Sequence, residues 1–158
     1  HFEEHIIFNF REWRLTYFLD NNSLSTEEVL LRLLAVLLAF IFVHSVRKNK
    51  ASAHVLLYFL MTTQVVNAFF HIFFSLYFLD FSPGAITGTL LYLPVNYFIF
   101  KAALNEGYVN NVKEISYFFV LGATSFALFE FIGPVVMQIT LLISVVYYFI
   151  SSKYNHGQ

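Results

Sequence analysis

The chain of 158 residues is 58% hydrophobic and 12% charged, whereas a soluble domain usually carries about twice that charged fraction. This composition argues against an ordinary soluble domain and predicts that much of the surface contacts a lipid bilayer. The absence of cysteine excludes disulfides, thiolate metal sites and cysteine nucleophiles, and the near-neutral net charge gives no indication of a nucleic-acid partner.

Residues 1–27 form the one sizeable polar stretch. Apolar side chains recur there at helical spacing, but charged residues interrupt them too often for a membrane span. We interpret this segment as a helix end followed by an amphipathic piece at the membrane surface. Trp13 and Tyr17 are expected at headgroup depth.

Five apolar segments follow, each of roughly the length that crosses a bilayer. The first begins at the capping-box pattern of Ser25 and Glu28 and ends at about Val46. The other four are predicted at about residues 54–79, 85–104, 115–132 and 134–150. The sequence therefore predicts an all-α, polytopic transmembrane bundle of about five spans, a single domain over 1–158 with the bundle itself at 28–151.

Two features refine the third predicted span. Ser82 is expected to cap its N-terminus, with Pro83 as the first helical residue, where the missing N–H does no harm. Pro94 lies within the span and is expected to kink it.

The distribution of Lys and Arg predicts the orientation of the bundle. Basic residues cluster in the loop 47–53, occur in the loop 105–114 and follow the last span. The positive-inside rule places both loops and the C-terminus in the cytoplasm. The N-terminal segment and the turns 80–84 and 133–134 then face outward.

The first five residues, HFEEH, carry a pattern with chemical meaning. On a helix, His1, Glu4 and His5 share one face, and Glu3 points elsewhere. His-x-x-Glu-His is also the pattern of inverted zinc peptidases, in which two histidines bind the metal and the glutamate is the base. A polar helix end at the water interface is the simpler interpretation of the same residues.

Three polar residues lie inside the second predicted span. Gln64, Asn67 and His71 share one helix face, which should look into the bundle because exposure of such groups to lipid is costly. Interhelical hydrogen bonding best explains Gln64. For His71, which can titrate and bind metal, a structural and a functional role stay open.

Glu130 lies near the end of the fourth predicted span. A carboxylate at that depth needs a cation, a metal or a proton, unless it reaches the nearby interface. With the predicted orientation, Glu130, His71 and the HFEEH segment all lie at the outer level of the bundle. This convergence predicts a metal site of mixed His and carboxylate ligands, which suit zinc, iron or manganese. The predicted ligands are Glu3, Glu4, His71, His1, His5 and Glu130, with Glu4 as the catalytic candidate.

Two stretches, HFEEHIIFNFREW and VVNAFFHIFFSLYFLDFSPGAITGTLLYLP, resemble a family of small multi-pass proteins, the HXXEE-motif membrane proteins. The resemblance covers most of residues 1–100 and implies Glu3, Glu4 and His71 as the matching polar positions. It implies a membrane fold but no reaction. The family motif is His, two residues, then Glu-Glu, whereas His1 precedes the two glutamates by one residue too few. The leading His would fall just before residue 1, and if the chain continues there, one further membrane helix is expected to precede it. If it does not, the motif is imperfect and the site assignment is weaker.

Two functional hypotheses follow. The first is a metal-dependent membrane enzyme in which the metal polarises a carbonyl or phosphoryl group, or activates water, on an amphipathic substrate at the outer leaflet. The second is a non-catalytic accessory subunit of a larger membrane complex, whose Phe-rich exterior contacts other membrane-protein subunits. A transporter is a third alternative, which the lack of an inverted repeat does not support.

Overall fold

The computed structural model describes residues 3–20 and 26–154. Every regular element within these ranges is helical, which confirms the all-α prediction. Three short pieces, marked η, are π-helical. The elements are η1 (Glu3–Ile7), α1 (Phe10–Tyr17), α2 (Thr26–Arg47), α3 (Lys50–Leu60), η2 (Met61–Val66), α4 (Asn67–Phe78), α5 (Ala85–Thr87), η3 (Gly88–Tyr92), α6 (Leu93–Asn105), α7 (Val112–Ile132) and α8 (Val135–Tyr154).

Four helical stretches in the described residues are long and apolar enough to cross a membrane, so the chain is an integral membrane protein. Three of them are single helices, and the second joins α3, η2 and α4 end to end. The capping residue predicted for the first, Ser25, lies outside the described residues. The four stretches are Glu28–Arg47, Lys50–Phe78, Val112–Ile132 and Val135–Lys153.

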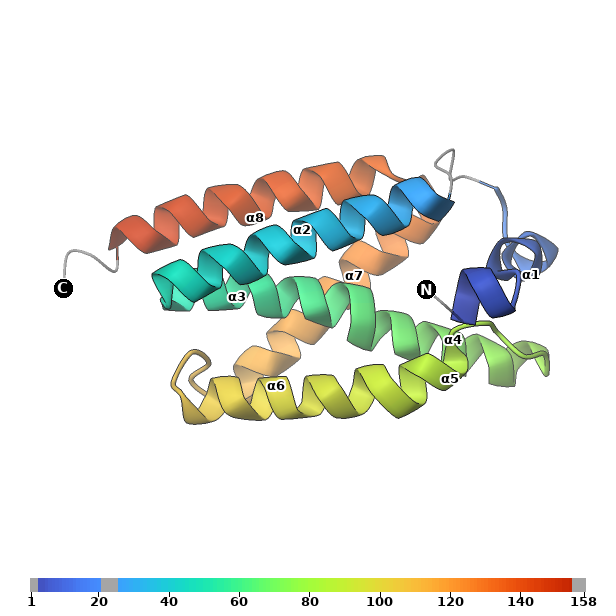
Figure 1. Cartoon of the computed structure of the whole chain (residues 1–158), viewed down its shortest axis with the longest axis horizontal. Helices are drawn as coiled ribbons and strands as arrows, with labels where there is room; N and C mark the ends of the chain where they lie inside the picture. Colours follow the sequence, from blue (N-terminus) through green and yellow to red (C-terminus); the bar gives the residue numbers. More distant parts are fainter. Residues whose placement is uncertain (1–2, 21–25, 155–158) are drawn as a thin grey trace.

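The third predicted span is a run of three helical pieces, α5, η3 and α6, which lies beside the other segments (Figure 1). It is not among the four apolar stretches found in the described chain. With it, five helical segments lie side by side, in agreement with the predicted number. Pro94 lies in the first turn of α6 and the π-helical turn η3 directly precedes it. The irregularity therefore takes the form of a widened turn before the proline, which lacks the N–H that an α-helical ladder needs.

The segments alternate in direction, so the connections gather at two ends (Figure 1). At one end, the α2–α3 turn contacts both the α6–α7 loop and α8, through hydrogen bonds from Lys50 to Asn110 and from Asn49 to Ser152. This is the end that the positive-inside rule predicts to be cytoplasmic. The opposite end, which the same rule predicts to face outward and which we call the outer end, holds α1, the turn 79–84 and the α7–α8 turn.

A small buried core joins α3, η2, α6 and α7; it consists of Leu57, Met61, Phe100, Ala103, Val109 and Phe118. Close packing of α7 on η2 depends on Gly122, where an added Cβ would lie 3.0 Å from the Thr62 hydroxyl. Large apolar side chains cover the outside, and Phe131, for example, is 83% exposed. Such a surface is unfavourable in water and suited to lipid.

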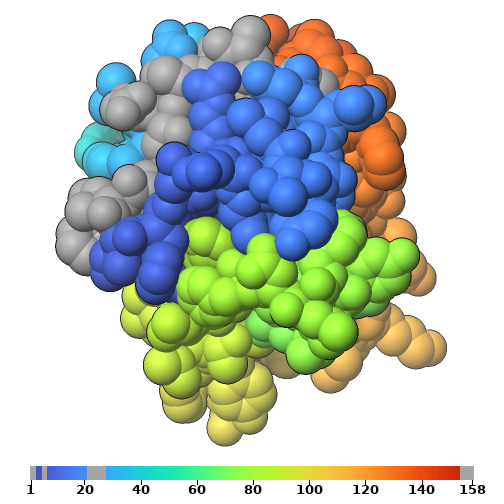
Figure 2. Space-filling view, turned by 90° about the vertical axis from the view of Figure 1, so that its right-hand side faces the viewer, coloured from blue at the N-terminus to red at the C-terminus, as the bar shows by residue number. Residues whose placement is uncertain are grey.

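The N-terminal elements η1 and α1 lie across the outer end of the bundle, over α4 and the turn 79–84 (Figure 2). Trp13 and Tyr17 were expected at headgroup depth. Trp13 is buried beneath α1 and packs against Phe78 of α4 and Phe18. Tyr17 stacks on the same Phe78 ring and donates a hydrogen bond to Asp80. The aromatic face of the amphipathic segment therefore packs on the end of α4.

Candidate functional site

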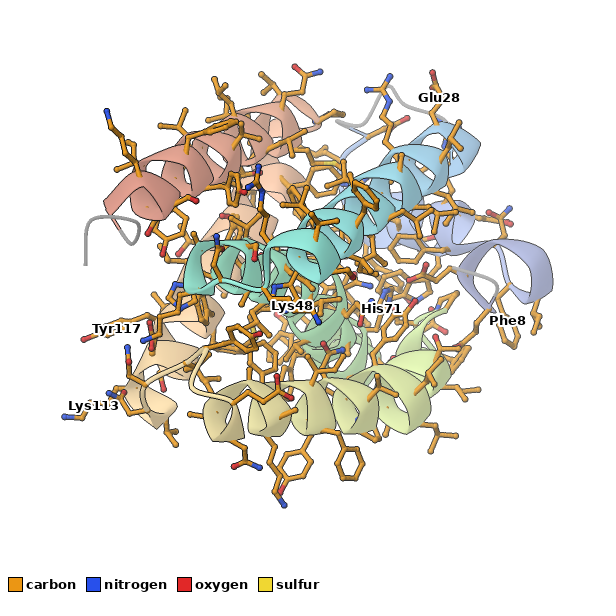
Figure 3. All side chains as sticks on the ribbon, turned by 60° about the vertical axis from the view of Figure 1, so that its left-hand side comes forward. Phe8, Glu28, Lys48, His71, Lys113 and Tyr117 are labelled. Atoms are coloured by element: carbon orange, nitrogen blue, oxygen red, sulfur yellow. The ribbon has the colours of Figure 1, made fainter. Side chains whose placement is uncertain are left out.

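The candidate site centres on a contact between η1 and α4. Nε2 of His71 lies 2.9 Å from Oε1 of Glu4, and both residues are almost fully buried. Figure 3 shows His71 inside the bundle, whereas labelled residues such as Lys113 and Tyr117 extend outward. Burial raises the pKa of the Glu4 carboxyl, and the adjoining imidazole lowers it, so that the pKa falls to about 2. Glu4 is therefore ionised at neutral pH.

Ser82 completes a row of three buried polar groups. Its hydroxyl lies 2.9 Å from Nδ1 of His71, at hydrogen-bond distance, and its backbone N–H donates to the hydroxyl of Ser75. The sequence predicted Ser82 as a helix cap, which is wrong. Gly84 occupies that position without a side-chain hydrogen bond, because the turn directs the Ser82 side chain toward His71 instead.

The contact between Glu4 and His71 has an unusual feature. Although the two atoms are close, Nε2 makes no hydrogen bond of acceptable geometry with any described residue. The N–H direction of the ring and the carboxylate oxygen are therefore misaligned. A buried ring nitrogen in this state can bind a further group that lies beside it and the carboxylate oxygen.

Gly84 forms the wall against which the pair packs. Its φ angle of 106° lies in the left-handed region that glycine tolerates best. A Cβ added there would lie 2.8 Å from both Glu4 Oε1 and His71 Nε2. The turn 79–84 can approach the pair this closely because residue 84 has no side chain.

Glu3, which the helical spacing placed on a different face from Glu4 and which was predicted as a metal ligand, instead binds backbone. One carboxylate oxygen accepts the N–H of Ile86 at 3.2 Å, and the other accepts the N–H of Thr87 at 2.6 Å. Burial raises the pKa of the Glu3 carboxyl, whereas hydrogen bonds from Thr87 and its neighbours lower it. The lowering is the larger effect, so the pKa lies below its ordinary value. Glu3 thus anchors η1 to the first turn after Gly84.

The comparison with known families bears on these two glutamates directly. Residues 1–99 match the family described as "Protein of unknown function with HXXEE motif". The chain belongs to the HXXEE family. No curated protein and no solved structure matches it. In this HXXEE protein, the adjacent glutamates join the N-terminal segment to the other recognised stretch. Glu4 contacts His71, and Glu3 accepts the backbone N–H groups of Ile86 and Thr87.

Glu130 of the HXXEE protein is paired with a cation from its own chain. Its Oε2 accepts hydrogen bonds from Nε and Nη2 of Arg14 at 3.1 and 3.0 Å, and Nη1 of Arg14 donates to the carbonyl of Leu19. The side chains of Arg14 and Glu130 are only 11% and 14% exposed. The sequence predicted a cation, a metal or a proton as the partner of Glu130, unless the carboxylate reached the interface. The structure supplies a cation, Arg14, which the sequence analysis did not identify.

The remaining predicted polar residues have different surroundings. Gln64 accepts a hydrogen bond from the buried amide of Asn96 at 2.7 Å, which matches the structural role expected for it. Asn67 instead lines a cavity. Sequence reasoning missed Asn96, although its place inside a predicted span was a signal of the same kind as that of Gln64.

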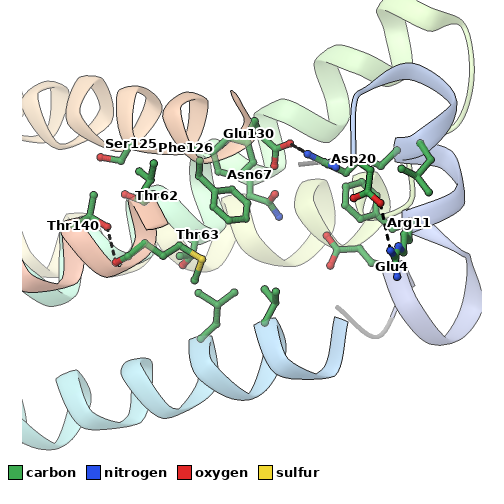
Figure 4. Close-up of a pocket in the computed structure, with 18 residues that line it drawn as sticks. Glu4, Arg11, Asp20, Thr62, Thr63, Asn67, Ser125, Phe126, Glu130 and Thr140 are labelled. Atoms are coloured by element: carbon green, nitrogen blue, oxygen red, sulfur yellow. Dashed lines mark hydrogen bonds and ion pairs between the residues drawn. The ribbon is translucent and has the colours of Figure 1, made fainter. Parts of the chain in front are cut away.

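This cavity, which we call the Glu4 cavity, has a volume of about 180 Å³ and lies between α1, α2, η2, α7 and α8. Figure 4 shows Glu4, Arg11, Asp20 and Glu130 around its outer end, with Asn67, Thr62, Thr63 and Thr140 further in. Apolar side chains of α1, α2, α7 and α8 supply most of the remaining wall. The lining is therefore amphipathic, and Glu4 connects it to His71.

The four predicted metal ligands whose side chains the structure describes do not form one cluster, and no group of three His, Asp or Glu residues among the described residues could hold a metal ion. Glu4 and His71 meet, Glu3 binds backbone, and Glu130 binds Arg14. His1 and the side chain of His5 lie outside the described residues. The site that the structure assembles is therefore the pair Glu4–His71, backed by Ser82.

Replacement of Gly84 by Ala should disturb this pair. The variant G84A introduces a Cβ into the contact between Glu4 and His71, whereas G107A introduces one at φ 75° with no atom within 4 Å. G107A should cost about 1–2 kcal/mol of backbone strain, and G84A should cost clearly more. Denaturant titration in mild detergent measures the free energy of unfolding of both variants. An equal loss in G84A and G107A would show that only backbone strain, and not the contact with Glu4 and His71, requires glycine at position 84.

The anchoring role of Glu3 predicts a pH dependence of stability. Because the folded-state pKa of Glu3 is lowered from 4.5, its contribution is fully present above pH 4.5 and is lost as the pH falls below that value. E3Q should therefore lower the unfolding free energy by about 1.5–3 kcal/mol at neutral pH, and the difference from wild type should shrink on acidification. The exposed Glu12 provides the control E12Q, and a constant difference across pH would contradict the assignment.

Proposed function

We propose that this HXXEE protein is a membrane-embedded enzyme that binds an amphipathic substrate in the Glu4 cavity and transfers a proton through the Glu4–His71 pair. One observation carries the proposal: Glu4 lies in the cavity wall while a buried histidine contacts its carboxylate from behind. A buried acid and imidazole in contact, placed at a cavity, are typical of acid–base sites.

The pair supports proton transfer in a defined direction. The low pKa of Glu4 keeps its carboxylate ionised and able to accept a proton, and the Ser82 hydroxyl lies at hydrogen-bond distance from the other nitrogen of the His71 ring. Glu4 can take a proton from a substrate atom in the cavity. The pair is reset when that proton is returned to another substrate atom or to water, so no oxidant or reductant is needed.

The surroundings support an amphipathic substrate. The outer end of the cavity is lined by charged side chains, while Leu33, Phe126 and Met137 line its inner part. A molecule with one polar end and one apolar end would satisfy both regions. Because four stretches of the chain are suited to lipid, such a molecule is available in the surrounding bilayer.

Metal binding by the same pair is the second candidate, and the unpartnered Nε2 of His71 favours it. Two ligands at right angles, each about 2.0–2.1 Å from an ion, lie about 3 Å apart, close to the 2.9 Å separation of Nε2 and Oε1. An ionised carboxylate and an imidazole suit zinc, iron or manganese. Water or substrate would supply further ligands, and the metal would polarise a substrate oxygen or activate water.

Hydrogen exchange into lipids tests the proton-transfer proposal. The full chain in phosphatidylcholine nanodiscs is incubated with a neutral-lipid extract in deuterium oxide, and mass spectrometry follows deuterium incorporated into individual amphiphiles. E4Q and H71N should lower the rate by about a hundred-fold or more. The matched control is E12Q on the exposed face of α1. Exchange that is undiminished in E4Q and H71N, or absent from wild type, would overturn the proposal.

Metal content distinguishes the two chemistries. If the pair binds metal, the purified protein should contain close to one zinc, iron or manganese ion per chain, and H71N should lose it. Elemental analysis before and after dialysis against chelator measures this. Metal-free wild-type protein with full exchange activity would eliminate the second candidate. Stable co-purification with large partners in mild detergent, with E4Q and H71N fully functional in that complex, would instead favour an accessory subunit.

A further inference from the structure

The Glu4 cavity continues into a crevice between α2 and α8. Five residues line both spaces, namely Leu33, Thr62, Thr63, Met137 and Thr140. From there the crevice runs past Val36 and Phe40 on one side and Leu141 on the other. Its floor is formed by α3 and η2. The crevice has a volume of about 350 Å³. Its lining residues follow α2 and α8, so the crevice extends along these two helices.

The crevice faces the bilayer because both of its walls are candidate membrane spans. Helix α2 packs mainly on α3 and at most weakly on α8, so the described residues of α2 and α8 are not closely packed against each other. Figure 4 shows side chains of the cavity lining between α2 and the helices that carry Thr140 and Thr63. A hydrocarbon chain could therefore lie in the crevice and extend into the bilayer.

The hydroxyl groups in the shared region do not oppose an apolar occupant. Thr62 donates to the carbonyl of Tyr58, Thr63 to that of Phe59, and Thr140 to that of Met137. Each hydroxyl proton is thus used within its own helix, as is common for threonine in membrane helices. The threonine methyl groups and the Met137 side chain are left to contact a hydrocarbon chain.

The charges at the outer end restrict the headgroup. The lining contains the guanidinium groups of Arg11 and Arg14, but these are already paired with Asp20 and Glu130. With Glu4, the described part of the lining holds three carboxylates and two guanidinium groups. A phosphate or carboxylate headgroup would meet guanidinium groups that already have partners. A headgroup that donates a hydrogen bond to a carboxylate of this lining is favoured.

A second apolar groove, between α4 and α7, also reaches this region. It shares only Phe126 and Glu130 with the lining of the Glu4 cavity. The ion pair of Glu130 with Arg14 lies at this junction and separates the two spaces. The α2–α8 crevice is therefore the better continuation of the cavity.

We infer that the Glu4 cavity binds a single-tailed amphiphile with an uncharged, hydrogen-bond-donating headgroup, such as a long-chain alcohol, which enters from the bilayer between α2 and α8. This inference names the substrate class of the site in the proposed function and rests on that proposal for the reaction. Binding itself does not depend on it. The headgroup lies beside Glu4, and the tail lies between Leu33 and Met137.

The inference is tested with a long-chain alcohol that carries a photoreactive diazirine in its tail, added to the full chain in phosphatidylcholine nanodiscs. Labelling that an excess of unlabelled hexadecanol suppresses defines specific binding. M137W and L33W fill the crevice and should weaken specific binding by about ten-fold or more. The matched controls I139W and L34W place the same residue on exposed positions of the same helices and should leave binding unchanged.

Two further comparisons make the result decisive. A123W blocks the α4–α7 groove and should leave binding intact. Hexadecanoic acid and a single-chain phosphate should compete at least ten-fold less well than hexadecanol. Loss of binding in A123W but not in M137W or L33W, or stronger competition by the anionic probes, would overturn the inference. If E4Q retains full lipid exchange while M137W abolishes binding, the proposed reaction fails and the assigned substrate class stands.

Discussion

The organisation of the outer end depends on one buried contact, that between Glu4 and His71. Each group alone would be costly to remove from water, whereas together they offset part of that cost. The contact holds η1 against α4, and α1 can therefore lie across the bundle end with Trp13 turned inward. Without this cover the space beneath α1 would be an open depression. The Glu4–His71 contact and the cavity thus both depend on how η1 and α1 pack on the bundle.

Polar groups gather at this end for a reason that membranes impose. An unpaired charge is costly in lipid, so each charged group inside the bundle needs a partner from another element. Arg14 meets Glu130 across 116 residues, and Glu3 meets the backbone of Ile86 and Thr87. These contacts tie α1 and η1 to α7 and to the turn after Gly84. The same ties leave Glu4, whose carboxylate faces the cavity, in a position set by its neighbours.

The helices could be predicted from the sequence because the bilayer requires long apolar segments and because polar turns separate them. Placement of His71 inside the bundle followed from its spacing to Gln64 and Asn67, and it is buried as expected. The partners of these residues could not be predicted in the same way. Local spacing indicates which face a side chain occupies but not which distant residue it contacts. Ser82 was therefore assigned as a cap, and Arg14 was not recognised as the partner of Glu130. The predicted metal cluster has the same origin, since a shared level in the membrane does not make Glu130 and His71 neighbours.

The two adjacent glutamates have different partners because consecutive helical residues point in different directions. Glu3 accepts two backbone N–H groups and is fully occupied in anchoring η1. Glu4, one residue on, is carried by that anchor to His71 and to the cavity wall. A single glutamate could either accept these backbone N–H groups or line the cavity beside His71, but not both. A Glu-Glu sequence on a short helical turn therefore lets one carboxylate attach the segment while the other lies at the cavity wall, as the proposed function requires.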